Sequence, residues 1–295
     1  MATGDSGNYA GSLLEVIEAE AILKFSEASV SVPLVKQKSE PKADQITFVA
    51  YNAGSNKVTS GDVANTAEGD VTPSTALDSE KKTITLDMYS VMLPIYDEAK
   101  LSNADDVYAN AGALAGNAMA SKLDALVNAL YDGFSNAVGA NNSALTVDNL
   151  FDALSSLKQN SAPGQPHAVL EPRQIWGTYG VHNDLVTSAV FAGAGIQDEG
   201  ARNGFVSKIA GIDMYSSPEF TITDNDGGSS GTASSVKGGI FVSEAIGFGY
   251  AGEMMRVEEY REGSFLRSNI VVSSFCGATE IIDGYGVEVL SQIIA

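Results

Sequence analysis

The chain has 295 residues, of which 44% are hydrophobic and 18% are charged. This composition excludes a disordered or collagen-like chain, and the length allows one large globular domain or two modest ones. The 17 basic and 37 acidic residues give a net charge of −20. Such a charge argues against a protein that wraps DNA or lies on a membrane surface, because phosphate groups recruit Lys and Arg.

The only cysteine, Cys276, lies in an apolar run, so we expect it to be buried, and no internal disulfide bond is possible. The sequence does not begin with the pattern of a signal peptide, and no run approaches the roughly 20 apolar residues that span a bilayer. We therefore expect a soluble protein made in a cytosol, with no membrane partner.

The first quarter of the chain predicts an arm, a helix and two strands. Residues 1–11 are small and polar and predict a mobile arm. Apolar residues spaced by three and four predict a helix from Ser12 to Ala28. Strands are predicted at Val30–Val35, which contains a proline typical of an edge or bend, and at Gln45–Tyr51.

A long β-hairpin is predicted over roughly residues 48–96. Its returning arm, Lys81–Tyr96, alternates as a strand with Ile84, Leu86 and Met88 on one face. Arms of about 15 residues would project on the order of 50 Å. An isolated two-stranded hairpin is marginal in water, so we expect this one to lie on a neighbouring subunit. A disordered loop inside an enzyme is the alternative.

A single long helix is predicted from Ser102 to Phe134. Ser102 and Asp105 fit a capping box at its start, and Gly133 fits its end. The small residues from Ala109 to Ala120 would let another backbone approach closely. The apolar face comprises Val107, Ala111, Leu114, Ala115, Ala118, Met119, Leu123, Leu126, Val127, Leu130 and Phe134.

A polar linker at 137–145 is expected to lead into a helix at Val147–Gln159, capped by Thr146. Its inward residues are predicted to be Leu150, Phe151, Leu154 and Leu157. A strand at His167–Leu170 and a helical turn opened by Pro172 follow. Later strands are predicted at Ile209–Tyr215, 239–245, 251–260, 266–278 and 285–290.

Four sequence features resemble catalytic or ligand-binding motifs, but the context of each one argues against such a site. Residues 4–7 read GDSG, but no His or Asp of a serine-protease triad lies upstream at a usable distance. Residues 247–252 match GxGxxG without a crossover helix, which favours chance strand glycines. Asp224–Gly227 lacks calcium-loop spacing. His167 and His182, with one cysteine, do not build a zinc or Cys-His site. We expect no catalytic, cofactor or metal site, although an enzyme with an unrecognised carboxylate pair stays an alternative.

In element order, the chain resembles the major capsid proteins of tailed double-stranded DNA phages, which have the Hong Kong 97-like fold. The resemblance covers nearly the whole chain through loose patterns. They are the helical arm LLEVIEAEAILKFSEAS, the hairpin with AEGD at 67–70 and Pro73, the strand TITLDMYSVMLPI, the long helix, and the segments HAVLEPRQIW, GGIFVSEAIGF and CGATEIIDGYGVEVL.

The resemblance implies an α+β fold with four parts. These are an N-terminal arm at 1–46, an extended loop at 47–97, a peripheral domain with a long spine helix at 98–145 and 252–295, and an axial domain at 146–251. The implied contacts between subunits from the extended loop are Lys57, Asp62, Glu68, Asp70, Lys81 and Lys82. The implied packing residues of the spine helix are Leu114, Gly116, Met119, Leu123 and Leu126.

The resemblance also implies a function. Copies would form hexamers and pentamers of an icosahedral shell around the double-stranded DNA genome, assembled in the host cytoplasm and retained in the virion. Because no scaffold-like domain precedes the arm, a separate scaffolding protein is expected, together with a portal and possibly a cement protein. An encapsulin-like cellular compartment with protein cargo is the alternative within this fold.

Overall fold

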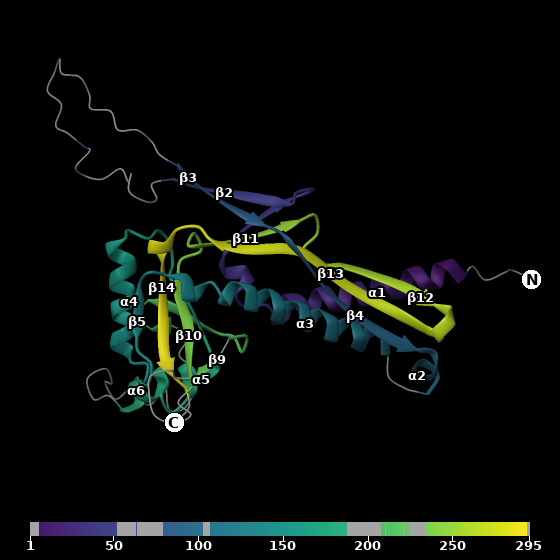
Figure 1. Cartoon of the computed structure of the whole chain (residues 1–295). Coiled ribbons are helices and arrows are strands. Elements are labelled where there is room, and N and C mark those ends of the chain that lie inside the picture. The colour runs from purple at the N-terminus through teal and green to yellow at the C-terminus, as the bar shows by residue number, and fades with distance from the viewer. Residues whose placement is uncertain are drawn as a thin grey trace, which may run out of the picture.

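The structure is a computed structural model, and it describes residues 6–51, 63, 79–102, 107–187, 208–209, 211–220, 222–224 and 234–293. Figure 1 shows an elongated molecule: a long sheet lies over two helices, and a second block of strands and helices stands at one end. A two-stranded hairpin, β2–β3, lies over the first sheet and leads away from it.

The helices are α1 (Ser6–Ala28), α2 (Asp97–Ser102), α3 (Val107–Asn128), α4 (Val147–Gln159), α5 (Pro172–Trp176) and α6 (Val181–Thr187), with 3₁₀ turns η1 (Val32–Leu34), η3 (Tyr131–Gly133), η4 (Gly263–Phe265) and η5 (Asp283–Tyr285). The strands are β1 (Lys36–Glu40), β2 (Gln45–Tyr51), β3 (Ser79–Thr85), β4 (Asp87–Tyr96), β5 (Ala137–Gly139), β6 (His167–Leu170), β7 (Lys208–Ile209), β8 (Ile212–Ser216), β9 (Ile222–Asp224), β10 (Ser234–Phe241), β11 (Ile246–Ala251), β12 (Arg256–Glu262), β13 (Arg267–Glu280) and β14 (Gly286–Gln292). No helix in these described stretches is long and apolar enough to cross a membrane.

The five-stranded sheet is organised around β13. This strand pairs antiparallel with β4, β11 and β12, while β1 adds parallel to β11. Alternate residues of β13, among them Ile270, Val272 and Cys276, are fully buried on the face that α3 covers. Helix α1 packs against α3 and β12, so the two helices and the sheet share one hydrophobic core.

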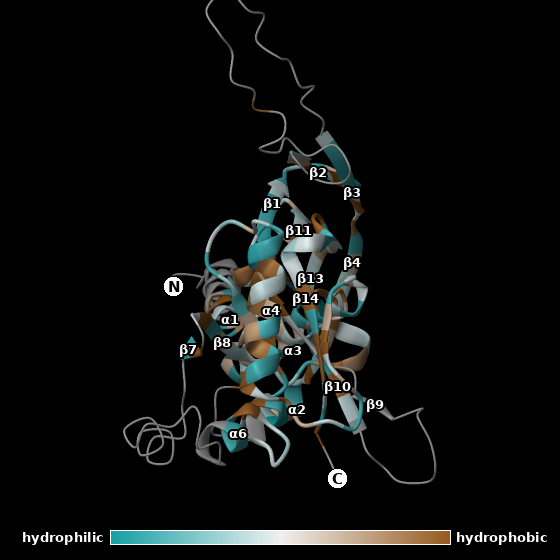
Figure 2. Ribbon diagram, turned by 90° about the vertical axis from the view of Figure 1, so that its left-hand side faces the viewer, coloured by the Kyte–Doolittle hydropathy of each residue, from teal (hydrophilic) through white to brown (hydrophobic). Residues whose placement is uncertain are grey.

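The seven-stranded sheet has the order β5-β14-β10-β6-β8-β7, with β9 beside β10. Helix α4 closes a second core with Leu150 and Leu157, both of them buried. Figure 2 shows hydrophobic and hydrophilic residues in turn along α4, as an amphipathic helix requires. Strand β14 comes from the expected peripheral segment 252–295, and β11 from the expected axial segment 146–251. Each of these two predicted segments therefore contributes strands to both sheets.

The N-terminal helix is longer than the sequence predicted. It begins at Ser6 instead of Ser12, so part of the expected arm is helical. The predicted strand at Val30–Val35 is wrong: Pro33 lies in the 3₁₀ turn η1, and the strand that pairs with β11 starts only at Lys36. The strand at Gln45–Tyr51 is confirmed.

The returning arm of the predicted hairpin is split. Strand β3 pairs with β2 in register from Gln45↔Thr85 to Tyr51↔Ser79, but β4 leaves the hairpin and pairs with β13. The division falls at Leu86, whose N–H donates to the Asp44 carbonyl at 3.0 Å. Of the three residues predicted to share a face, Ile84 and Leu86 are buried, whereas Met88 is 71% exposed, because it belongs to a different sheet.

The long helix is shorter than predicted. Helix α3 covers 22 residues, and the chain then continues as the 3₁₀ turn η3, so the helix ends at Asn128 instead of Gly133. Ser102 belongs to the separate helix α2, and Asp105 lies outside the described residues, so the expected capping box is not seen.

Several later predictions are confirmed, with exceptions. The α4 boundaries and its cap are confirmed, since the Asn149 N–H donates to Thr146 Oγ1 at 3.3 Å. Phe151 was predicted to face inward but is 44% exposed. The linker at 137–145 contains the strand β5, and the strand expected at 209–215 is divided into β7 and β8 at Gly211, which has φ +82°.

Candidate assembly surfaces

The base of the hairpin β2–β3 packs directly over three glycines of the five-stranded sheet, Gly247, Gly249 and Gly277. Ile46, Phe48 and Ile84 of β2 and β3 are buried against β11 and the C-terminal end of β13. An added Cβ at Gly249 would lie 3.1 Å from Ile46 Cδ1, and one at Gly277 would lie 2.7 Å from the Thr85 carbonyl oxygen. Two glycines of the GxGxxG motif at 247–252 therefore have a structural role: Gly247 and Gly249 let the hairpin approach the sheet.

Of the six expected loop contacts, the structure describes two. Lys81 is exposed on β3, and Lys82 pairs with Glu80 at 2.8 Å, which raises the pKa of Lys82. The other four lie outside the described residues: Lys57, Asp62, Glu68 and Asp70. The outward face of the hairpin also carries Tyr51, which is 61% exposed, so it presents an aromatic ring beside a positive charge.

Helices α1 and α3 are in backbone contact. An added Cβ at Gly112 would lie 2.9 Å from the Ile17 carbonyl oxygen, and one at Gly116 would overlap the Ala21 carbonyl. These two glycines lie one helical turn apart on the same face of α3, so they form a groove for the α1 backbone.

The structure places the expected spine residues on different sides of α3. Gly116, Met119 and Leu123 are buried, and Leu126 is partly buried against the same core. Leu114 is 64% exposed, so its predicted place on the packed face is wrong within the subunit. The helix period allowed Leu114, but α1 and the sheet cover the stripe that runs through Ala115 and Met119 instead.

A buried carboxylate joins the end of α1 to α3. Asp124 is 2% exposed. Its oxygens accept hydrogen bonds from Ser29 Oγ at 3.1 Å and from the N–H groups of Val30, Ser31 and Val32 at 2.7, 3.0 and 3.2 Å. Burial raises the pKa of Asp124, although each of these hydrogen bonds acts to lower it.

Asn128, one turn further along α3, extends this network. It accepts from Ser31 Oγ at 2.6 Å and donates to the Glu219 carbonyl at 2.9 Å, so it links the segment after α1, helix α3 and the segment after β8. Sequence reasoning missed both groups. The available signal was two polar residues, Asp124 and Asn128, within the buried i, i+4 stripe of an apolar helix.

The end of α3 is fixed on glycines of the second sheet. The fully buried ring of Tyr131 occupies the space where a Gly239 Cβ would be, at 2.6 Å from its Cγ, and Phe134 covers Gly286. Burial raises the pKa of the Tyr131 hydroxyl. These rings connect the two hydrophobic cores, because Tyr131 also stacks on Phe241 with centroids 5.3 Å apart.

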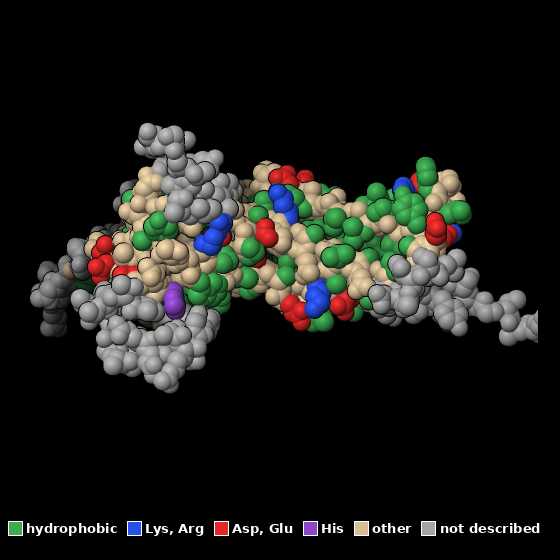
Figure 3. Space-filling view, turned by 90° about the horizontal axis from the view of Figure 1, so that it is seen from below, with side chains coloured by type: hydrophobic (Ala, Val, Ile, Leu, Met, Phe, Trp, Pro, Cys, Tyr) green, Lys and Arg blue, Asp and Glu red, His purple; other side chains and the backbone are tan. Residues whose placement is uncertain are grey.

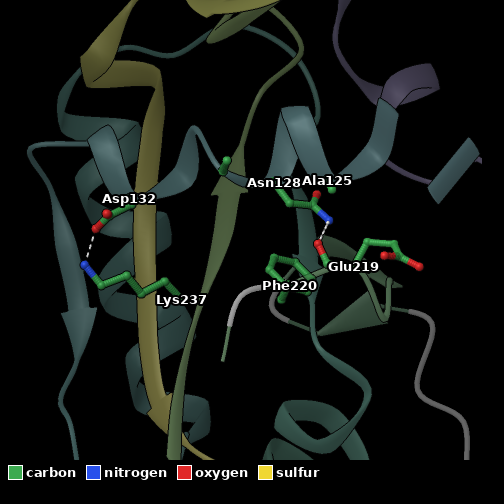
Figure 4. A pocket seen from close by; sticks show the side chains of 7 residues that line it. Ala125, Asn128, Asp132, Glu219, Phe220 and Lys237 are labelled. Carbon is green, nitrogen blue, oxygen red and sulfur yellow. Dashed lines mark hydrogen bonds and ion pairs between the residues drawn. The ribbon is translucent and has the colours of Figure 1, made fainter. Parts of the chain in front are cut away.

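A cavity of about 510 Å³ lies beside this junction. Figure 4 shows the side chains that line it. Lys237 projects across it toward Asp132 and also lies 3.2 Å from Glu288. Hydrogen bonding to Asp132 raises the pKa of Lys237, whereas burial raises the pKa of Glu288 despite the pairing. The lining residues are Ala125, Asn128, Ala129, Asp132, Glu219, Phe220 and Lys237.

The Lys237 amine in this cavity is already paired, and no described residue that lines the cavity is a cysteine, histidine or serine. Across the described part of the chain, no group of three His, Cys, Asp or Glu residues could hold a metal ion. His167 stands on β6 with its Nδ1 4.0 Å from Asp213, and burial lowers its pKa. Cys276 is buried, which raises its pKa to about 11.

Large apolar side chains are exposed in the five-stranded half of the molecule. Met88, Met92 and Tyr96 are 71%, 48% and 50% exposed on β4, and Phe265 and Leu266 are 59% and 63% exposed where β12 turns into β13. Figure 3 shows hydrophobic side chains gathered at the right-hand end of the molecule, the end at which this turn lies in Figure 1. Such surfaces are typical of proteins that bind other proteins.

Comparison with known proteins agrees with this picture. A sequence model of the family described as phage capsid protein matches residues 79–279, about two thirds of the chain. No curated protein sequence matches the chain.

Solved structures share the fold at low sequence identity. The capsid of the cyanophage P-SCSP1u matches with a TM-score of 0.65 and 17% identity, over 90% of this chain and 88% of that one. The Mycobacterium phage Che8 structure matches with 0.62 and 16%, over 88% and 90%. The SrpI encapsulin complex from Synechococcus elongatus PCC 7942 matches with 0.56 and 12%, over 89% and 86%.

The chain belongs to the phage capsid protein family. It has the α+β, Hong Kong 97-like fold of tailed-phage capsids. Its function is that of a major capsid protein of the phage head shell, a structural protein of the virion and not an enzyme.

Proposed function

We propose that copies of this chain assemble as hexamers and pentamers into a closed icosahedral shell around packaged double-stranded DNA. The observation that carries the proposal is the combination of family membership with a subunit whose hairpin and β12–β13 turn present apolar side chains to solvent. A subunit that worked alone would gain nothing from exposing Tyr51 on the hairpin and Phe265 and Leu266 at the turn.

Each part of the subunit has a place in this assembly. The five-stranded sheet with α1 and α3 forms the peripheral domain, and α3 is its spine helix. The seven-stranded sheet with α4 forms the axial domain, which meets its copies at the centre of a capsomer. The hairpin β2–β3 is the base of an extended loop that lies over an adjacent subunit, where Lys81 and Tyr51 make contacts.

The charge of the chain suits a container for DNA. At −20, the subunit repels phosphate groups, so the packaged genome stays free to move. Empty shells are expected to bind no DNA at low salt, and tight binding there would contradict this role for the charge. A separate scaffolding protein, a portal and a cement protein are the further partners that the proposal includes.

Sedimentation and electron microscopy of the purified chain test the proposal. We expect uniform shells or hexameric rings, and a monomer that stays monomeric at every concentration would contradict it. Nucleic acid in native particles would support the phage shell. Protein cargo without nucleic acid would instead favour a compartment like the encapsulin that shares this fold.

A further inference from the structure

The two faces of the hairpin β2–β3 carry different side chains. In the strand register, Val49 lies opposite Lys81, and both are exposed. Phe48 lies opposite Lys82, and Phe48 is buried where the hairpin packs over the sheet. Opposite residues of an antiparallel pair share one face. Lys82 therefore belongs to the face that looks toward the sheet, and Lys81 belongs to the outward face.

Lys82 lies among carboxylates at the β3 edge of the hairpin. Its Nζ is 2.8 Å from Glu80 Oε1 on the same strand. The hydrogen bond with Glu80 raises the pKa of Lys82, and the negative charges of Glu280 and Asp283 raise it too. Because Glu280 and Asp283 belong to the rest of the subunit, their attraction for Lys82 ties the hairpin to the end of β13.

Glu280 and Asp283 come from the segment that joins β13 to β14, and their charges repel each other. Asp283 Oδ1 accepts a hydrogen bond from the Ser135 N–H at 2.7 Å, and Glu280 Oε2 would lie 3.4 Å from a Cβ added at Gly133. Burial and the charge of Asp283 raise the pKa of Glu280, whereas Lys82 lowers it. Lys82 therefore stabilises the ionised form of Glu280.

A second lysine ties the opposite edge of the hairpin. Lys38 of β1 donates from Nζ to the Thr47 carbonyl of β2 at 3.1 Å. Glu40, on the same strand as Lys38, lies 3.1 Å from that Nζ and orients it. The hairpin is therefore tied at both edges, by Lys38 at β2 and by Lys82 at β3.

We propose that Lys38 and Lys82 are positioning residues that hold the hairpin at a fixed angle to its own subunit, and that Lys82 makes no contact with an adjacent copy. The contact between subunits that the resemblance implied for Lys82 is thereby left to the outward Lys81. The consequence rests on the proposed shell function, because the angle decides whether the hairpin reaches an adjacent copy. The ties themselves are a property of the isolated subunit.

The first test compares Lys82→Gln with Lys81→Gln, since these neighbouring lysines lie on opposite faces. Without the Lys82 charge, Glu80 of the hairpin repels Glu280. We therefore expect hydrogen exchange in β2 and β3 of the Lys82→Gln subunit to speed up by about threefold or more, with α4 unchanged. Lys81→Gln should keep wild-type exchange, and Lys82→Arg, which retains the charge, should restore it.

A second comparison separates charge from packing. In the double variant Lys82→Gln with Glu280→Gln, one of the repelling carboxylates is gone, so hairpin exchange should slow toward the wild-type rate. Exchange in the Lys82→Gln single variant should also slow as NaCl rises from about 0.02 M to about 0.5 M, because salt screens repulsion. Absence of both effects would overturn an electrostatic tie.

The tie at the β2 edge has its own test. Lys38→Met removes the donor to the Thr47 carbonyl, so exchange in β2 should speed up by about twofold or more. Lys36→Met, on the same strand, is the control. Equal exchange in the two variants would overturn the role of Lys38.

Assembly distinguishes positioning from contact. If Lys82 positions the hairpin, the double variant with Glu280→Gln should recover shell formation although residue 82 still lacks a charge. Recovered hairpin exchange without recovered shells would mean that Lys82 contacts an adjacent copy, which would overturn its assignment.

The outcomes also separate this inference from the proposed function. Unchanged hairpin exchange in Lys82→Gln, or an equal change in Lys81→Gln, would overturn the tie even if wild-type shells form. Absence of wild-type shells would overturn the proposed function, and faster hairpin exchange in the Lys82→Gln subunit would still support the tie.

Discussion

Side chains are absent from the contact between α1 and α3 but prominent at the turn between β12 and β13. Where the two helices cross, Gly112 and Gly116 remove every side-chain atom so that backbones can meet. At the turn, Phe265 and Leu266 present large apolar groups to water. We therefore expect folding of the subunit and its assembly to rest on separate residues, and substitutions should separate the two properties.

The largest expected effect is at the helix crossing. Gly116→Leu would place a side chain where the Ala21 backbone lies, and neither helix can move without opening the core, so we expect a loss of about 3 kcal/mol or more in the free energy of unfolding. Denaturant unfolding measures it. Asn117→Leu, on the exposed side of the same helix, is the control, and equal stability of the two variants would mean that the crossing is not close.

The hairpin base should respond next. Gly277→Val would press a side chain against the Thr85 carbonyl oxygen. The hairpin should therefore move away from the sheet, and the free energy of unfolding should fall by about 2 kcal/mol. Hydrogen exchange should speed up in β2 and β3 more than in α4. Gly263→Val is the control, because no atom lies within 4 Å of its added Cβ. Unchanged hydrogen exchange in the hairpin would contradict its close packing on Gly277.

A smaller loss is expected for Asp124→Asn. The amide offers one oxygen where the carboxylate offers two, and its NH₂ would face backbone donors, so we expect a loss of about 1.5 kcal/mol near neutral pH. Because burial raises the folded-state pKa of Asp124, its contribution is full below the unfolded pKa and declines as the pH rises through the folded pKa.

The pH dependence gives that prediction a second readout. As the pH rises above the unfolded-state pKa of Asp, about 4, the wild-type free energy of unfolding should carry a decline that the Asp124→Asn variant lacks. Asp152→Asn, at an exposed position on α4, should keep the wild-type profile. Identical slopes in wild type and Asp124→Asn would contradict a raised pKa.

The smallest effect on stability is expected at the turn between β12 and β13. Phe265→Ser removes a ring that is 59% exposed, so the free energy of unfolding should change by less than about 0.5 kcal/mol. Assembly followed by light scattering should nevertheless weaken. A large drop in unfolding temperature would mean that Phe265 belongs to the core, and the contrast between the two regions would fail.

Much of the secondary structure was predictable from patterns in neighbouring residues. The β2 boundaries, the α4 helix with its Thr146 cap and the strand at β6 were predictable, because alternation, amphipathic spacing and capping chemistry are written in neighbouring residues. The split at Leu86 was not predictable, because it depends on β4 pairing with a strand about 180 residues later. For the same reason, the exposure of Leu114 depends on where α1 packs.

The candidate surfaces were harder to read from sequence than the fold. Gly247 and Gly249 were interpreted as chance glycines, although their spacing of two places them on one face of a strand, which is the signal of a close approach. The exposed side chains at the β12–β13 turn were not predictable, because Leu266 fits the strand predicted at 266–278 and no element was predicted for Phe265. Their exposure follows only from the left-handed turn.

The decisive experiment is cryo-electron microscopy of particles assembled from the purified chain. We expect a closed shell in which the hairpin β2–β3 of each subunit lies over an adjacent copy and the α1–α3 contact stays within one subunit. A hairpin that contacts only its own subunit, or a failure to form shells at any concentration, would contradict it.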